Sequence, residues 1–151
     1  MSILSRTFRT DATSAAPLVL RLALGSVFIG HGAQKLFGWW GGYGFQGTAG
    51  FFESKLSLTP GWLHAGLAGG GEFFGGILLI LGLFTRFAAA QAAVIMSVAI
   101  WTVHRSAFFA QDNGMEYPLT LLLVAVALTL TGGGALSFDA HLAKTGTASR
   151  K

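Results

Sequence analysis

Four ionisable side chains lie inside segments that are otherwise apolar, and they are the residues of this sequence best placed to do chemistry. Glu72 lies in the middle of one apolar run, and Arg21, His31 and Lys35 lie in another. A charged side chain is costly in lipid, so such residues usually face a protein interior, a cavity or the interface. Carboxylate, imidazole and ammonium groups held together in a water-poor site can exchange protons. The sequence therefore predicts a polar site inside a membrane.

Helical periodicity places three of these residues on one face of their helix. Arg21, His31 and Lys35 fall on one stripe of a helix. Counting about 1.5 Å per residue from the outer end of each run puts Glu72 level with Phe28, His31 about 5 Å further out and Lys35 about 10 Å further out. Side chains lean toward the N-terminus of their own helix, so His31 and Lys35 lean toward Glu72. We predict a His31–Glu72–Lys35 cluster in the outer half of a bundle, and a separate contact near the inner boundary for Arg21.

The composition is typical of a membrane protein rather than a soluble one. Of 151 residues, 52% are hydrophobic and 11% are charged, and the charged share is about half that of a soluble domain. The net charge of +4 is carried by basic residues scattered singly, which argues against nucleic acid as a partner and leaves membrane lipid. The chain has no cysteine, so it cannot supply a thiolate for an iron–sulfur cluster or attach haem c.

Four apolar runs predict four membrane-spanning helices in one domain. A span needs about 20 apolar residues. The expected spans are 17–39, 61–84, 87–103 and 115–131, of which the last two are short. They make residues 17–139 a membrane domain between an N-terminal segment, 1–16, and a tail, 140–151. Glycine and alanine in the spans let helices approach closely, so the expected fold class is an all-α four-helix transmembrane bundle.

The distribution of lysine and arginine predicts that both termini are cytoplasmic. With the N-terminus inside, the inner side carries six basic residues and the outer loops two, which satisfies the positive-inside rule. The long outer loop 38–60 opens with aromatic residues of the type that anchor proteins at headgroups. Those aromatics either anchor the loop or form a mouth for a lipophilic substrate. Within the loop, residues 47–58 are expected to form a short interfacial helix.

Two further groups of polar residues lie near the outer ends of the spans. His31, His64 and His104 could together ligate haem b or a metal, but no two have metal-ligand spacing on one helix. We therefore predict no metal site and no haem b. The pair Asn113-Gly114 predicts a turn, which would bring Glu116 to the outer mouth.

Four motifs, in order, resemble the DoxX family of small four-helix membrane proteins over about 20–139. They are Arg21 with His31-Gly32-x-x-Lys35, Glu72-x-x-Gly75-Gly76 running into Leu81-Gly-Leu-x-Thr85-Arg86, Asn113-Gly-x-Glu116, and Gly132–Gly134 with Ser137-x-Asp139. Met115 and Gly133 depart from the family pattern, in which glycine and proline are common. The family includes a membrane subunit of thiosulfate:quinone oxidoreductase and a mycobacterial membrane protein linked to oxidative-stress and thiol defence. The resemblance implies a multi-pass protein of the bacterial inner membrane.

Three functions fit these observations. The expected one is the membrane subunit of a quinone-linked oxidoreductase or redox-stress complex, which has no redox cofactor of its own. In it, Glu72, His31 and Lys35 form the catalytic cluster, and His31, Glu72, Glu116 and Arg21 contact a quinone. The second is a structural or assembly subunit in which buried charges fix helix register. The third is a small-solute carrier or channel built on the glycine-rich second span around Glu72. The first implies a soluble or membrane oxidoreductase partner, and the small-residue faces allow a homo-oligomer.

Overall fold

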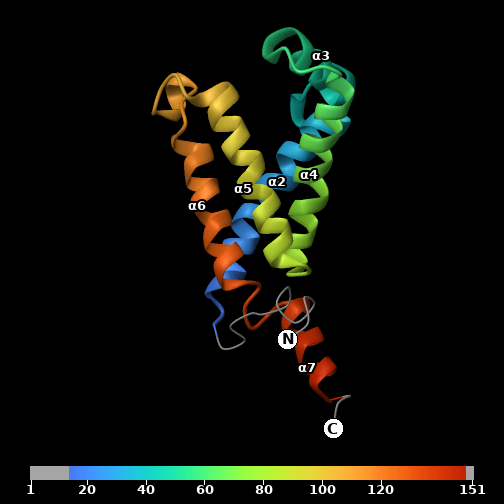
Figure 1. Ribbon diagram of the computed structural model, residues 1–151, viewed down its shortest axis with the longest axis vertical. Helices are drawn as coiled ribbons and strands as arrows, with labels where there is room; N and C mark the ends of the chain where they lie inside the picture. Colours follow the sequence, from blue (N-terminus) through green and yellow to red (C-terminus); the bar gives the residue numbers. More distant parts are fainter. Residues whose placement is uncertain (1–13, 149–151) are drawn as a thin grey trace.

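The computed structural model describes residues 14–148, with side chains as far as residue 145, and this part of the chain is all-helical. The helices are α2 (Ala16–Phe37), α3 (Gly44–Leu56), α4 (Gly61–Leu81), α5 (Thr85–Ala99), α6 (Glu116–Thr131) and α7 (Phe138–Ala148), with short helical segments η1 (Trp39–Gly41), η2 (Ile100–His104) and η3 (Ala110–Asp112) (Figure 1). The all-α class expected from the sequence is confirmed. Most of the predicted N-terminal segment, 1–16, lies outside the described residues.

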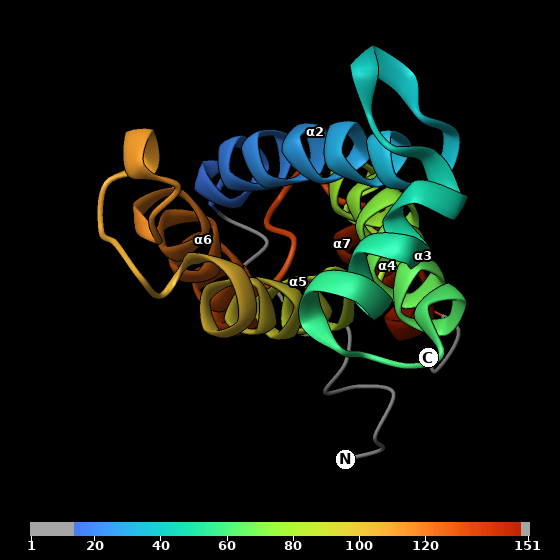
Figure 2. The same cartoon turned by 90° about the horizontal axis from the view of Figure 1, so that it is seen from above.

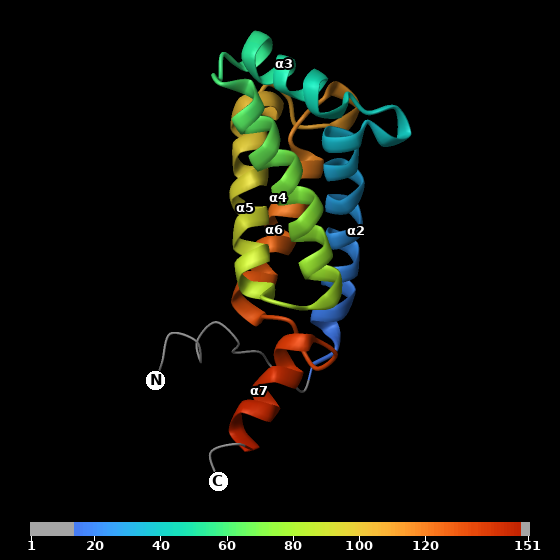
Figure 3. The ribbon, with the colours of Figure 1, turned by 90° about the vertical axis from the view of Figure 1, so that its right-hand side faces the viewer.

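Helices α2, α4, α5 and α6 pack side by side as a bundle. Seen from one end they follow one another in the order α2, α4, α5, α6, and α6 closes the ring against α2 (Figure 2). Helix α3 covers one end of the bundle, and α7 leaves the other (Figure 3). The buried core between the four helices is made by Leu24, Phe28, Leu79, Ala88, Ala89, Ala92, Met96, Leu121, Ala125 and Leu128.

Three of the helical segments are long and apolar enough to cross a membrane. They are α2, α4 and the continuous stretch Thr85–His104, which have 22, 21 and 20 residues. Helix α6 has 16 residues, so at about 1.5 Å per residue it spans about 24 Å, less than the hydrocarbon thickness of about 30 Å. With η2 counted together with α5, the predicted ends are close to the observed ones, and the largest difference is Phe84 against Leu81. Four membrane crossings, with both termini cytoplasmic, stay predictions.

Helices α2 and α4 touch backbone to backbone because glycine lies at their crossing. A Cβ atom on Gly32 would lie 2.7 Å from the Cα of Phe73, and one on Gly76 would lie 2.8 Å from the carbonyl oxygen of Gly25. Only residues without a side chain permit this approach. The prediction that the second span is the partner of the polar first span is confirmed.

We expect Gly32→Ala to lower the free energy of unfolding by about 1–3 kcal/mol, because its methyl group would push α4 away from α2. Gly30 is the matched control: it lies on the same helix, and an added Cβ would meet nothing within 4 Å. Gly30→Ala should be neutral or stabilise by up to about 1 kcal/mol, through helix propensity. Unfolding of both variants in mixed detergent micelles measures the difference, and equal effects would contradict the close crossing.

Arg21 connects three segments at the end of the bundle that α3 does not cover. Its guanidinium is fully buried and donates hydrogen bonds to the carbonyls of Leu79 (3.2 Å), Ile80 (3.0 Å) and Leu136 (2.6 Å). The first two carbonyls belong to the last turn of α4, where helix carbonyls lack helical partners. The separate contact predicted for Arg21 is confirmed, and it ties α2 to α4 and to the segment before α7.

Asp139 fixes α7 to the bundle. The buried carboxylate accepts hydrogen bonds from the backbone N–H groups of Phe84 (2.8 Å) and Thr85 (2.9 Å). These groups open α5 and have no helical acceptor, so a distant carboxylate performs the task of an N-cap. Residues 140–148 of the predicted tail belong to α7. The hydrogen bonds of Asp139 hold the first turn of this helix against the start of α5.

Candidate functional site

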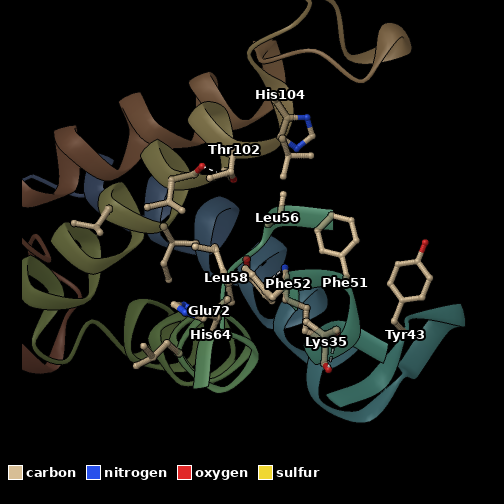
Figure 4. Close-up of a pocket in the computed structure, with 18 residues that line it drawn as sticks. Lys35, Tyr43, Phe51, Phe52, Leu56, Leu58, His64, Glu72, Thr102 and His104 are labelled. Atoms are coloured by element: carbon tan, nitrogen blue, oxygen red, sulfur yellow. Dashed lines mark hydrogen bonds and ion pairs between the residues drawn. The ribbon is translucent and has the colours of Figure 1, made fainter. Parts of the chain in front are cut away.

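A cavity of about 460 Å³ lies at the end of the bundle that α3 covers. Helices α3, α4 and α5 and the segment η2 form most of its wall, and Lys35 of α2 and Glu72 of α4 also line it (Figure 4). Much of the lining is aromatic or aliphatic, as at Phe51, Phe52 and Val98. The site is therefore an apolar chamber with a few polar groups, the usual composition of a small-molecule site.

Lys35 and Glu72 form an ion pair in this cavity. The distance between Lys35 Nζ and Glu72 Oε2 is 2.5 Å, and the two side chains are 29% and 5% exposed. The pair forms beside the glycine crossing of α2 and α4, where Gly69 leaves room for the stem of Lys35. The structure thus brings together two members of the predicted cluster. An almost buried carboxylate keeps its charge only with such a partner, so the pair places two ionisable groups in an apolar wall.

The structure does not bring His31 into this pair. His31 is exposed, and its ring lies against Tyr117 of α6, with 6.4 Å between the ring centroids. On a helix, His31 points about 100° away from its neighbour Gly32, and Gly32 is the residue that contacts α4. The prediction considered only how far His31 lies along the helix axis and its lean toward the N-terminus. The direction in which the side chain points around the helix decides whether it reaches Glu72.

Helix α3 is held over the cavity by two hydrogen bonds. The Thr48 hydroxyl donates to the carbonyl of Lys35 (3.2 Å), and the Glu53 carboxylate accepts from the N–H of Gly61 (2.7 Å). These bonds join α3 to the end of α2 and to the start of α4. The short helix predicted at 47–58 is confirmed as α3, Gly44–Leu56. Because Phe51 lines the cavity, this helix forms part of a wall as well as a surface.

Two of the three histidines considered in the sequence analysis as possible ligands, His64 and His104, line the same cavity. The His64 ring packs on Phe52 with centroids 5.9 Å apart, and His104 Nδ1 lies 2.9 Å from the carbonyl oxygen of Asn113. A carbonyl only accepts hydrogen bonds, so neutral His104 carries its proton on Nδ1 and keeps Nε2 as an acceptor. The predicted turn at Asn113 is confirmed, with φ of 59°.

Glu116 and Arg21 lie away from the cavity. Glu116 is the first residue of α6, and its backbone N–H donates to the carbonyl of Phe108 (2.8 Å). Neither residue is among those that line the chamber. Within residues 14–148, no group of three or more metal-ligating side chains occurs. The ligand contacts predicted for Arg21 and Glu116 therefore do not belong to this site.

The family model described as DoxX matches residues 16–105, and a second one, described as TQO small subunit DoxD, matches residues 61–150. The chain belongs to the DoxX family. With three apolar helices of spanning length, it is a membrane protein, and no solved structure matches it.

Relatives of this DoxX protein occur in distant bacteria. A Bacillus subtilis protein named "Putative oxidoreductase CatD" is 33% identical over 128 residues, or 84% of this chain and 87% of its own. An uncharacterized protein of Haemophilus influenzae is 32% identical over 84% of this chain and 83% of its own. An uncharacterized membrane protein of Mycobacterium tuberculosis is 30% identical over 87% of this chain and 83% of its own.

Several polar residues of the motifs that resemble DoxX lie toward the two ends of the bundle. Lys35 and Glu72 meet in the cavity at one end, where the carbonyl of Asn113 also holds His104. Arg21 and Asp139 join the segments at the other end. The first group could act on a ligand, and the second holds the helices together.

Proposed function

We propose that this DoxX protein is the inner-membrane subunit of a quinone-linked oxidoreductase and that its cavity binds the quinone ring. The observation that carries the proposal is the placement of one ion pair, Lys35–Glu72, in an apolar chamber of about 460 Å³. A quinone ring is flat and apolar except for its two carbonyl oxygens. It fits a site that offers aromatic walls and a few polar groups.

The chain's own residues supply binding and proton handling in this proposal. Reduction of a quinone takes up two electrons and two protons. The Lys35 ammonium donates a hydrogen bond to a carbonyl oxygen, and the Glu72 carboxylate takes up each of the two protons in turn and passes it to the reduced quinone. His104, with Nε2 as an acceptor, exchanges protons between the chamber and the outer surface. A soluble or membrane-bound oxidoreductase partner supplies the electrons.

The proposed arrangement in the membrane places the cavity in the outer half of the bilayer. It has four crossings, with α6 as the short fourth one, and both termini on the cytoplasmic side. Support comes from the exposed aromatic residues Trp39, Trp40 and Tyr43 at the α3 end and from Arg86 and Lys144 near the α7 end. Aromatic residues are enriched at interfaces, and basic residues are enriched on the cytoplasmic side.

Filling the chamber tests the proposal without touching its charges. Ala68 lines the cavity on α4, so Ala68→Trp should put an indole in the space that the ring needs. We expect at least about a tenfold loss of quinone affinity, about 1.4 kcal/mol or more. Quinone retained by the purified protein, measured by mass spectrometry, and direct titration give the two readouts.

Leu123→Trp is the matched control, because Leu123 is 61% exposed on α6 and does not line the cavity. That variant should bind quinone as the unmodified protein does. Equal binding by both tryptophan variants would contradict a quinone in this chamber and would favour a structural or assembly subunit.

A further inference from the structure

A second hollow lies at the α7 end of the molecule, far from the chamber. It is a groove of about 490 Å³ between the last residue of α4 and the first turns of α7. Leu81, Leu136 and Phe138 provide its apolar side, and His141 and Lys144 provide its polar side. The groove is open to the surface and contains no part of the Lys35–Glu72 site.

The groove lies at the depth of lipid headgroups. Helix α4 has 21 residues, so it spans about 31 Å, close to the thickness of the hydrocarbon core. Leu81 is its last residue and therefore marks the edge of the hydrocarbon. Helix α7 continues beyond that edge, away from the bundle (Figures 1 and 3).

An apolar stripe on α4 leads into the groove from the membrane side. Phe74, Ile77 and Leu81 are 62%, 36% and 42% exposed, and their spacing of three and four residues puts them on one face of the helix. An acyl chain can lie along this stripe while its headgroup reaches the groove. A soluble anion has no apolar part that could contact this stripe.

The polar side of the groove is basic. His141 and Lys144 are three residues apart on α7, so their side chains are neighbours. Residues 140–151 contain no acidic residue and add Arg150 and Lys151. The carboxylate of Asp139 is occupied by Phe84 and Thr85. Anionic lipids attract such basic segments by about 1 kcal/mol per charge.

We propose that this groove binds the headgroup of an anionic phospholipid of the inner leaflet. The acyl chain runs along Phe74, Ile77 and Leu81, and the phosphate meets Lys144 and His141. Because Asp139 fixes α7 to the start of α5, the lipid joins α7 to the lipid-facing side of α4. This site is independent of quinone binding.

Native mass spectrometry of the full-length protein tests the site, with phosphatidylglycerol or phosphatidylcholine added to the detergent. We expect the protein to retain phosphatidylglycerol in preference to phosphatidylcholine, and Lys144→Glu to lower that retention by about fivefold or more. Lys55→Glu is the control, because it reverses a charge on α3 at the opposite end. Lys144 is exposed, so its substitution should leave the fold intact, as circular dichroism would show.

Three results would overturn the proposal. One is equal retention of the two lipids, and another is equal loss in the two charge-reversal variants. The third is full displacement of the lipid by inorganic phosphate, because the groove would then be a site for a free anion.

Discussion

Glu72→Gln is expected to lower the affinity for a quinone by about tenfold or more while the protein stays folded, because hydrogen bonds to charged groups contribute about 1.5–3 kcal/mol. Glutamine keeps the shape of the side chain but cannot take up a proton or hold Lys35 by charge. Lys35 is 29% exposed in the cavity, so water can solvate its ammonium once the carboxylate is gone. Titration of the purified protein with a short-chain quinone measures the change.

Glu53→Gln is the matched control for this experiment. Glu53 also accepts a hydrogen bond at the α3 end of the bundle, from Gly61, but it does not line the chamber. Its substitution should leave quinone affinity unchanged. Loss of folded Glu72→Gln protein, with normal binding by the remainder, would assign Glu72 a purely structural role.

The two partners of the ion pair should respond differently to removal. Lys35→Met leaves the 5% exposed Glu72 carboxylate without a cation, which should destabilise the fold by about 3–5 kcal/mol. Adding Glu72→Gln to Lys35→Met removes that unpaired charge and should restore most of the stability, but not the quinone affinity. Restored binding in the double variant would show that the pair serves packing alone.

Asp139→Ala is expected to lower the free energy of unfolding by about 3–5 kcal/mol and to release α7. The substitution removes the carboxylate that accepts hydrogen bonds from the N–H groups of Phe84 and Thr85 and that interacts electrostatically with buried Arg21. Asp139→Asn keeps an acceptor and should cost less. Unfolding in mixed micelles and the rate of tryptic cleavage at Lys144 measure both effects.

Asp112→Ala is the control for this second prediction. Asp112 is exposed in η3, and its removal should change stability by less than about 0.5 kcal/mol. If Asp139→Ala behaves in the same way, α7 is not held by the buried carboxylate.

Long apolar runs and the positions of charges within them were enough to predict the four helices of the bundle and the Lys35–Glu72 contact. Helix length and depth follow directly from the sequence, because each residue advances a helix by a fixed rise. His31 shows where such reasoning stops. The position of His31 along α2 would have allowed a contact with Glu72. However, the glycine face of α2 turns toward α4, and His31 lies beside Tyr117 instead.

The cavity and the α7 anchor could not be predicted, because both depend on contacts between distant segments. Asp139 caps α5 from 54 residues away along the chain, whereas sequence patterns identify caps only within a few residues. The chamber exists because α3 folds back over α4 and η2. Its volume depends on how side chains from these elements pack against one another. Hydrophobic periodicity predicts which face of a helix is buried, but not this packing.

Photolabelling with an azidoquinone in lipid nanodiscs is the most direct test of a quinone in the chamber. We predict that the label attaches to peptides within 43–72 and 94–104, which hold most of the lining residues, and that excess unlabelled quinone prevents this. Glu72→Gln should reduce the same labelling strongly. Labelling spread over the lipid-facing side of α6, with no effect of Glu72→Gln, would contradict the proposed function.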